Sequence, residues 1–196
     1  MSLSEHLLLA RAVRPLAQEK VPALGEERCP PEIAKQLADL SPADLFEESA
    51  LVDADAARCC LSGLWLLHGD LNTSHEISQQ IETIDGSFWH GIMHRREGDF
   101  SNAKYWFRQV GSHACFSAIS TATRHICVAS TGLAIPPAAQ KLSMAWQPNL
   151  FVDYCQAIMQ QDRAGESAQA MLCRKIARAE WDALFEYCCR KAVGAK

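Results

Sequence analysis

The chain lacks both an excess of basic residues and any long apolar run. Its 19 Lys and Arg face 23 Asp and Glu, for a formal net charge of −4. A nucleic-acid-binding protein normally carries a basic face and a high pI, so nucleic acid is not an expected partner. No stretch approaches the ~18 apolar residues of a membrane-spanning helix. The early apolar run covers only residues 7–10 and follows no cationic segment, so no signal peptide is predicted. We expect a soluble cytoplasmic protein without a membrane partner.

Strand and hairpin signals are also missing, since no alternating β-branched run is bounded by turn residues. Helix starts recur instead, at Ser4 for a helix to Val13, and later at Pro30-Pro31, Ser41-Pro42 and Asp53. A chain of 196 residues with 48% hydrophobic residues can bury one core. The sequence predicts an all-α fold with at least six helices. We expect one irregular helical bundle over residues 1–196, with residues 1–40 as a candidate loosely packed extension.

Several motifs of catalysis are absent as well. There is no CxxC, no GxSxG and no glycine-rich phosphate loop. The cysteines number nine, and most occupy apolar helical positions, where cysteine behaves as a small hydrophobe. Adjacent cysteines on a helix, such as Cys188 and Cys189, cannot bridge to each other without strain. The sequence therefore predicts free, buried thiols in a reducing compartment.

Residues 65–113 have an unusual composition. They contain five of the seven histidines and three of the five tryptophans. These residues are His68, His75, His90, His94, His113, Trp65, Trp89 and Trp106. Aromatic and ionisable residues alternate here instead of separating onto two faces, which is typical of a ligand cleft.

A helix over residues 87–97 would carry two histidines and a carboxylate on one face, at spacings of four and three residues. Such a set can bind Zn²⁺, Fe²⁺ or Mn²⁺. Gly91 follows the first histidine, so the HExxH motif of zinc peptidases is absent. If a metal is present, we expect both His90 and His94 to bind it. The candidates for further ligands are His75, Glu76 and His113.

Without a metal, the same side chains could act as acid–base groups or simply be hydrogen-bonded. The candidate catalytic residues are then His75, His90, His94 and Glu97. Thr73 and Glu76 also fit a capping box, in which case Glu76 serves only to cap its own helix.

The same segment is locally basic, with four cations at Arg95, Arg96, Lys104 and Arg108. Two or more of them could converge on a phosphate or carboxylate. Trp89 and Trp106 would then form the walls of the cleft. The alternative is an internal network in which Glu97 and Asp99 pair with the cations. Two antiparallel helices joined at Gly98-Asp99 would place His94 near Lys104 if their faces converge.

The turn region resembles the centre of a tetratricopeptide repeat, at Gly98, Phe100, Ala103 and Phe107. The resemblance covers about one repeat, roughly residues 82–111, with no second copy at a 34-residue period. Residues 87–111 also resemble an uncharacterised family of small bacterial and fungal proteins with a similar HGxMHRREGDxxNAKYWFR signature. That resemblance implies no particular activity.

Two functions follow as hypotheses. The first is a binding protein or an enzyme that holds a small anionic molecule in a cleft lined by His, Arg and Trp. The alternative is a tetratricopeptide-like helical module that grips a partner protein. Five histidines and three tryptophans in one segment favour the first, because peptide grooves seldom need both together.

Overall fold

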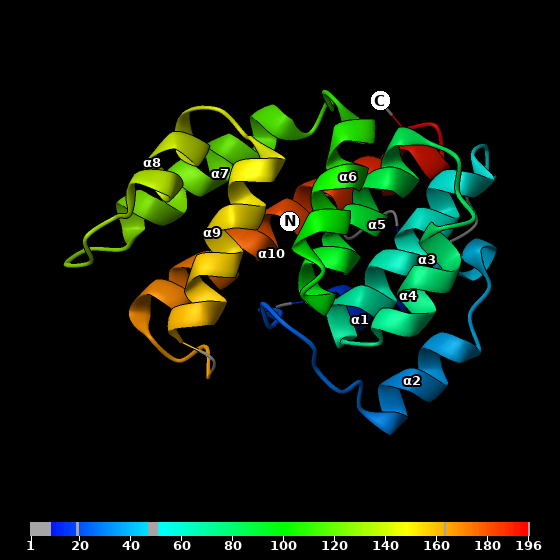
Figure 1. The fold of residues 1–196 in the computed structure, drawn as a ribbon. Coiled ribbons are helices and arrows are strands. Elements are labelled where there is room, and N and C mark those ends of the chain that lie inside the picture. Colours follow the sequence, from blue (N-terminus) through cyan, green and yellow to red (C-terminus); the bar gives the residue numbers. More distant parts are fainter. Residues whose placement is uncertain (1–8, 19, 47–50, 163, 196) are drawn as a thin grey trace.

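The computed structural model describes residues 9–18, 20–46, 51–162 and 164–195, and helices dominate these ranges (Figure 1). In chain order the elements are α1 (Arg14–Ala17), α2 (Pro31–Ala38), the 3₁₀ helix η2 (Pro42–Leu45), α3 (Ala54–His68), α4 (Leu71–Ser78), α5 (Ile84–Glu97), α6 (Phe100–Val110), α7 (Phe116–Ala129), α8 (Pro137–Met144), α9 (Pro148–Gln161) and α10 (Ala168–Ala192). Within the described ranges the only β pairing is an isolated bridge between Leu9 and Phe46. The predicted all-α helical bundle is confirmed.

The helices form two groups joined by α10. Helices α3 to α6 lie on one side of the molecule, α7 to α9 lie on the other, and α10 passes behind both (Figure 1). Helix α10 is 25 residues long but carries charged side chains along its length. In the described part of the chain, no helix combines the length and the apolar character needed to cross a membrane.

Helices α3, α5 and α10 meet in the core at Gly63, Trp89 and Trp181. Trp181 on α10 donates its indole N–H to the carbonyl of Gly63 on α3, at 2.8 Å. A Cβ at Gly63 would lie 2.8 Å from the ring of Trp89 on α5, so only glycine allows this approach. Phe185 and Trp89 are both 0% exposed. This contact fixes the position of α5, which carries most of the candidate site.

Helix starts follow the expected caps at several positions. The Asp53 carboxylate accepts a hydrogen bond from the backbone N–H of Ala56, at 2.9 Å, and so caps α3. Helices α2 and η2 begin at the expected prolines. The helix expected from Ser4 to Val13 lies largely outside the described residues, and α1 begins only at Arg14.

Two helical hairpins, α3–α4 and α5–α6, turn in the same way. Gly69 and Gly98 end the first helix of each with φ of 92° and 88°. Asp70 and Asp99 then cap the second helix by accepting from a backbone N–H three residues later. The capping box expected at Thr73 and Glu76 is therefore wrong, because Asp70 is the cap of α4. The two turns lie 29 residues apart, from 69 to 98, and this spacing differs from the 34-residue period of tetratricopeptide repeats.

Candidate functional site

Three histidines from two helices meet where α4 packs against α5. His75 comes from α4, and His90 and His94 lie one turn apart on α5. The ring centroids are 4.8 Å apart for His75–His90, 5.3 Å for His75–His94 and 4.7 Å for His90–His94. One nitrogen from each ring lies within 4.8 Å of the other two, and no other trio of His, Cys, Asp or Glu in the described ranges converges in this way.

His90 is the most buried of the three, with 3% of its surface exposed. Neither of its ring nitrogens has a hydrogen-bond partner among the described residues. Desolvation lowers the pKa of His90 to about 3, and charge on His94 or His75 would oppose its protonation further. A buried polar group without a partner costs free energy, so this site calls for an explanation. The neutral imidazole keeps a lone pair, which is the form that binds a metal ion.

His94 is oriented by two polar side chains. Its Nδ1 lies 3.0 Å from a carboxylate oxygen of Glu97, and its Nε2 lies 3.0 Å from the side-chain nitrogen of Asn102 on α6. With Nδ1–H donating to Glu97, Nε2 carries the lone pair and accepts from Asn102. Burial lowers the pKa of His94, while Glu97 partly opposes that shift. A carboxylate on the far nitrogen is the usual partner of a metal-binding histidine.

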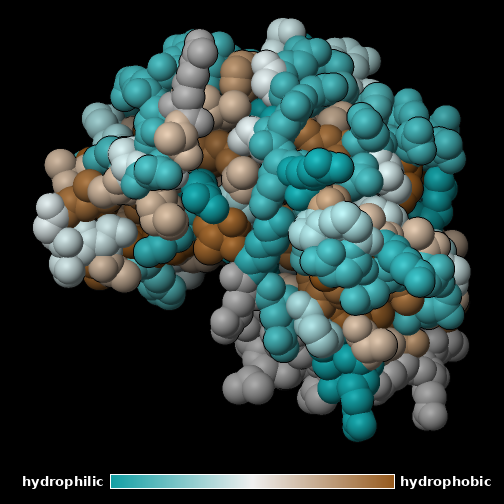
Figure 2. Space-filling view, turned by 90° about the horizontal axis from the view of Figure 1, so that it is seen from below, coloured by the Kyte–Doolittle hydropathy of each residue, from teal (hydrophilic) through white to brown (hydrophobic). Residues whose placement is uncertain are grey.

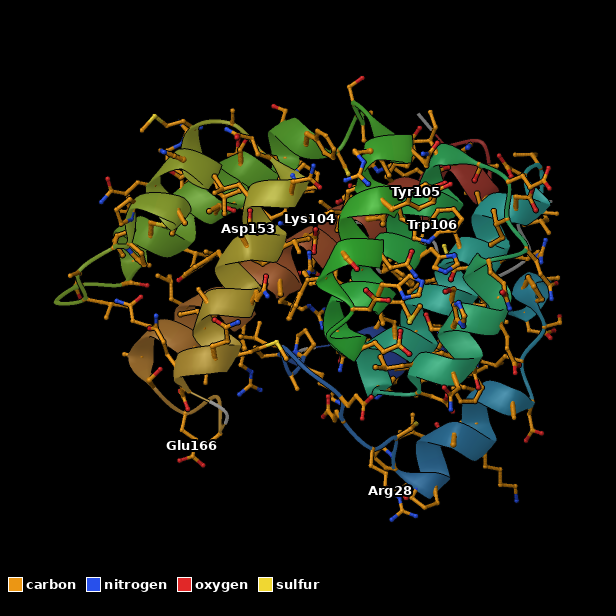
Figure 3. All side chains as sticks on the ribbon, in the orientation of Figure 1. Arg28, Lys104, Tyr105, Trp106, Asp153 and Glu166 are labelled. Carbon is orange, nitrogen blue, oxygen red and sulfur yellow. The ribbon has the colours of Figure 1, made fainter. Side chains whose placement is uncertain are left out.

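Trp106 covers the histidines from α6. Its ring stacks on His90, with centroids 4.2 Å apart and planes inclined by 14°. Figure 3 shows Trp106 on the side of α6 away from Lys104 and Asp153. Trp89, the other expected wall, instead points into the core, where its ring lies 6.0 Å from that of Trp181. Of the two predicted aromatic walls, the structure brings only Trp106 to the histidines.

The side chains of Arg95 and Arg96 both bind other groups of the same chain. Arg95 forms a two-pronged ion pair with Glu180, and the two side chains are 3% and 0% exposed. Arg96 donates to the backbone carbonyls of Leu66 and Gly25 and pairs with Glu27 at 3.3 Å. The structure therefore does not bring these two arginines to the histidines. They tie α5 to α10 and to the N-terminal segment.

Lys104 and Arg108 lie on a different face of α6 from the histidines. Lys104 forms an ion pair with Asp153 on α9 (Figure 3). Arg108 is exposed. The condition for Lys104 to approach His94, that their faces converge, is not met: Asn102 contacts His94, and Lys104 pairs with Asp153. Residues two apart on a helix point about 200° from each other, so 102 and 106 face the site while 104 and 108 face away. Asn102 was detectable in the sequence, four residues before Trp106 on the same face.

The remaining candidates lie elsewhere. Glu76 is exposed on α4 and does not join the cluster. His113 pairs with Asp85 at 2.8 Å in a separate network. His68 contacts the carbonyl of Leu16 at 2.8 Å and so holds the N-terminal segment. Of the three proposed further ligands, only His75 reaches His90 and His94.

Comparisons with known proteins give no indication of what this site does. No family model, curated protein or solved structure matches the chain. Its function has to be inferred from its own residues.

A cavity of about 350 Å³ lies beside Glu97, but none of the three histidines is among its lining residues. It is bounded by residues 26–29, by the α3–α4 turn and by Glu97, the partner of His94. Its acidic residues, which outnumber its single arginine, are Glu26, Glu27, Asp70 and Glu97. A second cavity of about 450 Å³ lies between residues 23–26 and the end of α9. Seen from below, the molecule is hollowed between its two groups of helices (Figure 2).

Proposed function

We propose that the protein binds one divalent transition-metal ion, Zn²⁺ in the simplest case, through His75, His90 and His94. The observation that carries the proposal is His90, a buried imidazole with two unpartnered nitrogens beside two other imidazoles. A Zn–N bond of about 2.0–2.1 Å places tetrahedral ligand atoms roughly 3.3 Å apart. The three nitrogens lie within 4.8 Å of one another, so in this proposal the side chains rotate to bring them closer together around the ion.

The electrostatics favour a cation here. Three neutral imidazoles leave the full 2+ charge on the ion, and Glu97 balances part of it through His94. The cavity beside Glu97 has an acidic lining, which favours cations near this end of α5. In loaded protein the ion would replace Asn102 as the partner of His94 Nε2.

Three protein ligands leave one coordination position for water or substrate. A metal ion in such a site lowers the pKa of its bound water and attracts anionic oxygens. We therefore propose a small anionic molecule as the ligand, with hydrolysis as the class of reaction. The ion supplies the positive charge that the buried arginines, already paired, do not offer. Trp106 would form one wall beside the ligand.

An interaction module is less well supported, although the repeated turn of the two hairpins favours it. Most of α5 is buried, including every residue from Phe88 to Arg96, so α5 offers no open face to a partner peptide. The histidine cluster would also have no role in such a module.

Metal titration of the purified full-length chain tests the proposal. After treatment with a chelator, the protein is titrated with Co²⁺ and Zn²⁺. We expect one ion per chain and the visible absorption of four-coordinate Co²⁺. Replacing both ligands on α5, His90→Ala with His94→Ala, should weaken binding by about a hundredfold or more.

His125→Ala is the matched control, because His125 lies exposed on α7, away from the cluster. It should bind the ion as the unmodified protein does. Binding that survives in the double variant, or that is lost equally in His125→Ala, would refute the site.

A further inference from the structure

A second polar cluster lies at the other end of α5, separate from the histidine trio. His113, in the loop before α7, places Nδ1 2.9 Å from the sulfur of Cys115. Its Nε2 lies 2.8 Å from a carboxylate oxygen of Asp85, at the start of α5. The other oxygen of Asp85 accepts from Lys191 on α10, at 2.7 Å. A thiol, an imidazole and a carboxylate therefore form a continuous hydrogen-bonded chain.

The hydrogen bonds assign the tautomer of His113. The backbone N–H of Cys115 donates to Nδ1 at 3.2 Å, so Nδ1 carries the lone pair. Nε2 carries the hydrogen and donates it to Asp85. Burial raises the pKa of Asp85, but His113 and Lys191 outweigh burial and lower it overall, so the carboxylate is ionised. The basic Nδ1 of His113 thus faces the thiol, and the ionised carboxylate of Asp85 accepts a hydrogen bond from the opposite nitrogen of the ring.

Cys115 is a thiol at rest. Burial raises its pKa, as does the negative charge of Glu180, and only 5% of its surface is exposed. It also occupies the N-cap of α7, a helix of 14 residues, where the helix dipole favours negative charge on sulfur. These features resemble a nucleophile that needs a base at the moment of attack.

We propose that Cys115 is a nucleophilic thiol, activated by His113 and Asp85, that forms a covalent bond with small uncharged electrophiles. The size limit follows from the burial of Cys115, of which only 5% is exposed, next to a loop in which Gly111, Ser112 and Ala114 are exposed. The preference for uncharged molecules follows from the rings around His113. Phe88, Tyr187 and Phe116 lie 5.4, 4.7 and 6.1 Å from it, between ring centroids.

Iodoacetamide illustrates the step. As the sulfur attacks the methylene carbon, the S–C bond forms and the C–I bond breaks, and iodide leaves with the electron pair. The thiol proton passes to Nδ1 of His113, where Asp85 stabilises the resulting imidazolium, and then to water. No oxidant or cofactor is needed.

Site-resolved alkylation tests the proposal. The native full-length chain is treated with iodoacetamide, and the rate at each cysteine is read by peptide mass spectrometry. Cys155 is the reference, because it is also buried, at 1% exposed against 5% for Cys115, and its thiol has the thiol of Cys173 at 3.6 Å in place of a histidine. We expect Cys115 to react about tenfold or more faster than Cys155. Iodoacetate, which is charged, should lose this preference for Cys115.

Two variants distinguish activation of the Cys115 thiol by His113 and Asp85 from simple access of the reagent to that thiol. His113→Gln and Asp85→Asn should each slow alkylation of Cys115 by about tenfold or more and leave the half-buried Cys127 unchanged. If a variant loosens the fold, Cys155 becomes reactive as well. The proposal is then tested by the alkylation rates of Cys115 and Cys155 in the unmodified protein. Cys115 reacting no faster than Cys155, or equally fast in a folded variant, would overturn the proposal.

Discussion

Trp106 lies flat on His90, an imidazole whose two nitrogens have no hydrogen-bond partner among the residues that the structure describes. Helix α6 thus covers the centre of the histidine cluster, although all three histidines come from α4 and α5. Any ligand of His90 has to displace or pass the half-buried indole.

Removing that cover should change the titration of His90. In metal-free Trp106→Ala, water would reach the ring, so the pKa of His90 should rise from about 3 toward its ordinary value of 6.5. Proton NMR of the histidine rings would measure the shift. Tyr105→Ala, one residue away on an exposed position, should leave it unchanged. An unaltered pKa in Trp106→Ala would mean that α5 and α4 alone exclude water.

The lowered pKa of His90 makes stability depend on pH. Between its folded value of about 3 and its ordinary value of 6.5, the unfolded chain binds a proton that the folded chain does not. Stability from this group is therefore complete above pH 6.5 and is lost as pH falls toward 3. Urea unfolding of metal-free protein at several pH values should show a shallower pH dependence in His90→Gln than in the unmodified chain. Equal slopes would contradict the prediction.

Two ion pairs should differ sharply in their importance for stability. Glu180→Gln leaves the Arg95 guanidinium buried without its counter-charge, which should lower the free energy of unfolding by about 3–5 kcal/mol. Asp153→Asn removes the partner of Lys104, but these side chains are 55% and 31% exposed, and the expected loss is below about 1 kcal/mol. Chemical denaturation measures both. Similar losses would show that Arg95 finds another partner.

The repeated turn allows a comparison between two glycines with the same backbone conformation. An alanine with positive φ costs about 1–2 kcal/mol at either site. At Gly98 a Cβ meets nothing within 4 Å, whereas at Gly69 it would lie 2.7 Å from the carbonyl oxygen of Glu27. Gly69→Ala should therefore lower the melting temperature clearly more than Gly98→Ala. Equal shifts would mean that the segment around Glu27 yields without cost.

Local regularities could be predicted from the sequence. Proline and aspartate caps predicted helix starts, and the four-residue spacing of His90 and His94 predicted their shared face. These follow from helix geometry, which depends only on neighbours along the chain. The choice of His75 over Glu76 and His113 could not be predicted in the same way, because it depends on how α4 meets α5.

Partners distant in the sequence were decided only by the tertiary structure. Arg95 looked like an anion-binding residue, yet its partner is Glu180, 85 residues away. Lys104 looked like a neighbour of His94, but α6 is oriented so that the Lys104 side chain faces α9 and pairs with Asp153. The residue sequence alone determined the helices and which side chains share a face. Packing then decided which faces meet, because burying a charge is tolerable only where a distant helix supplies its partner.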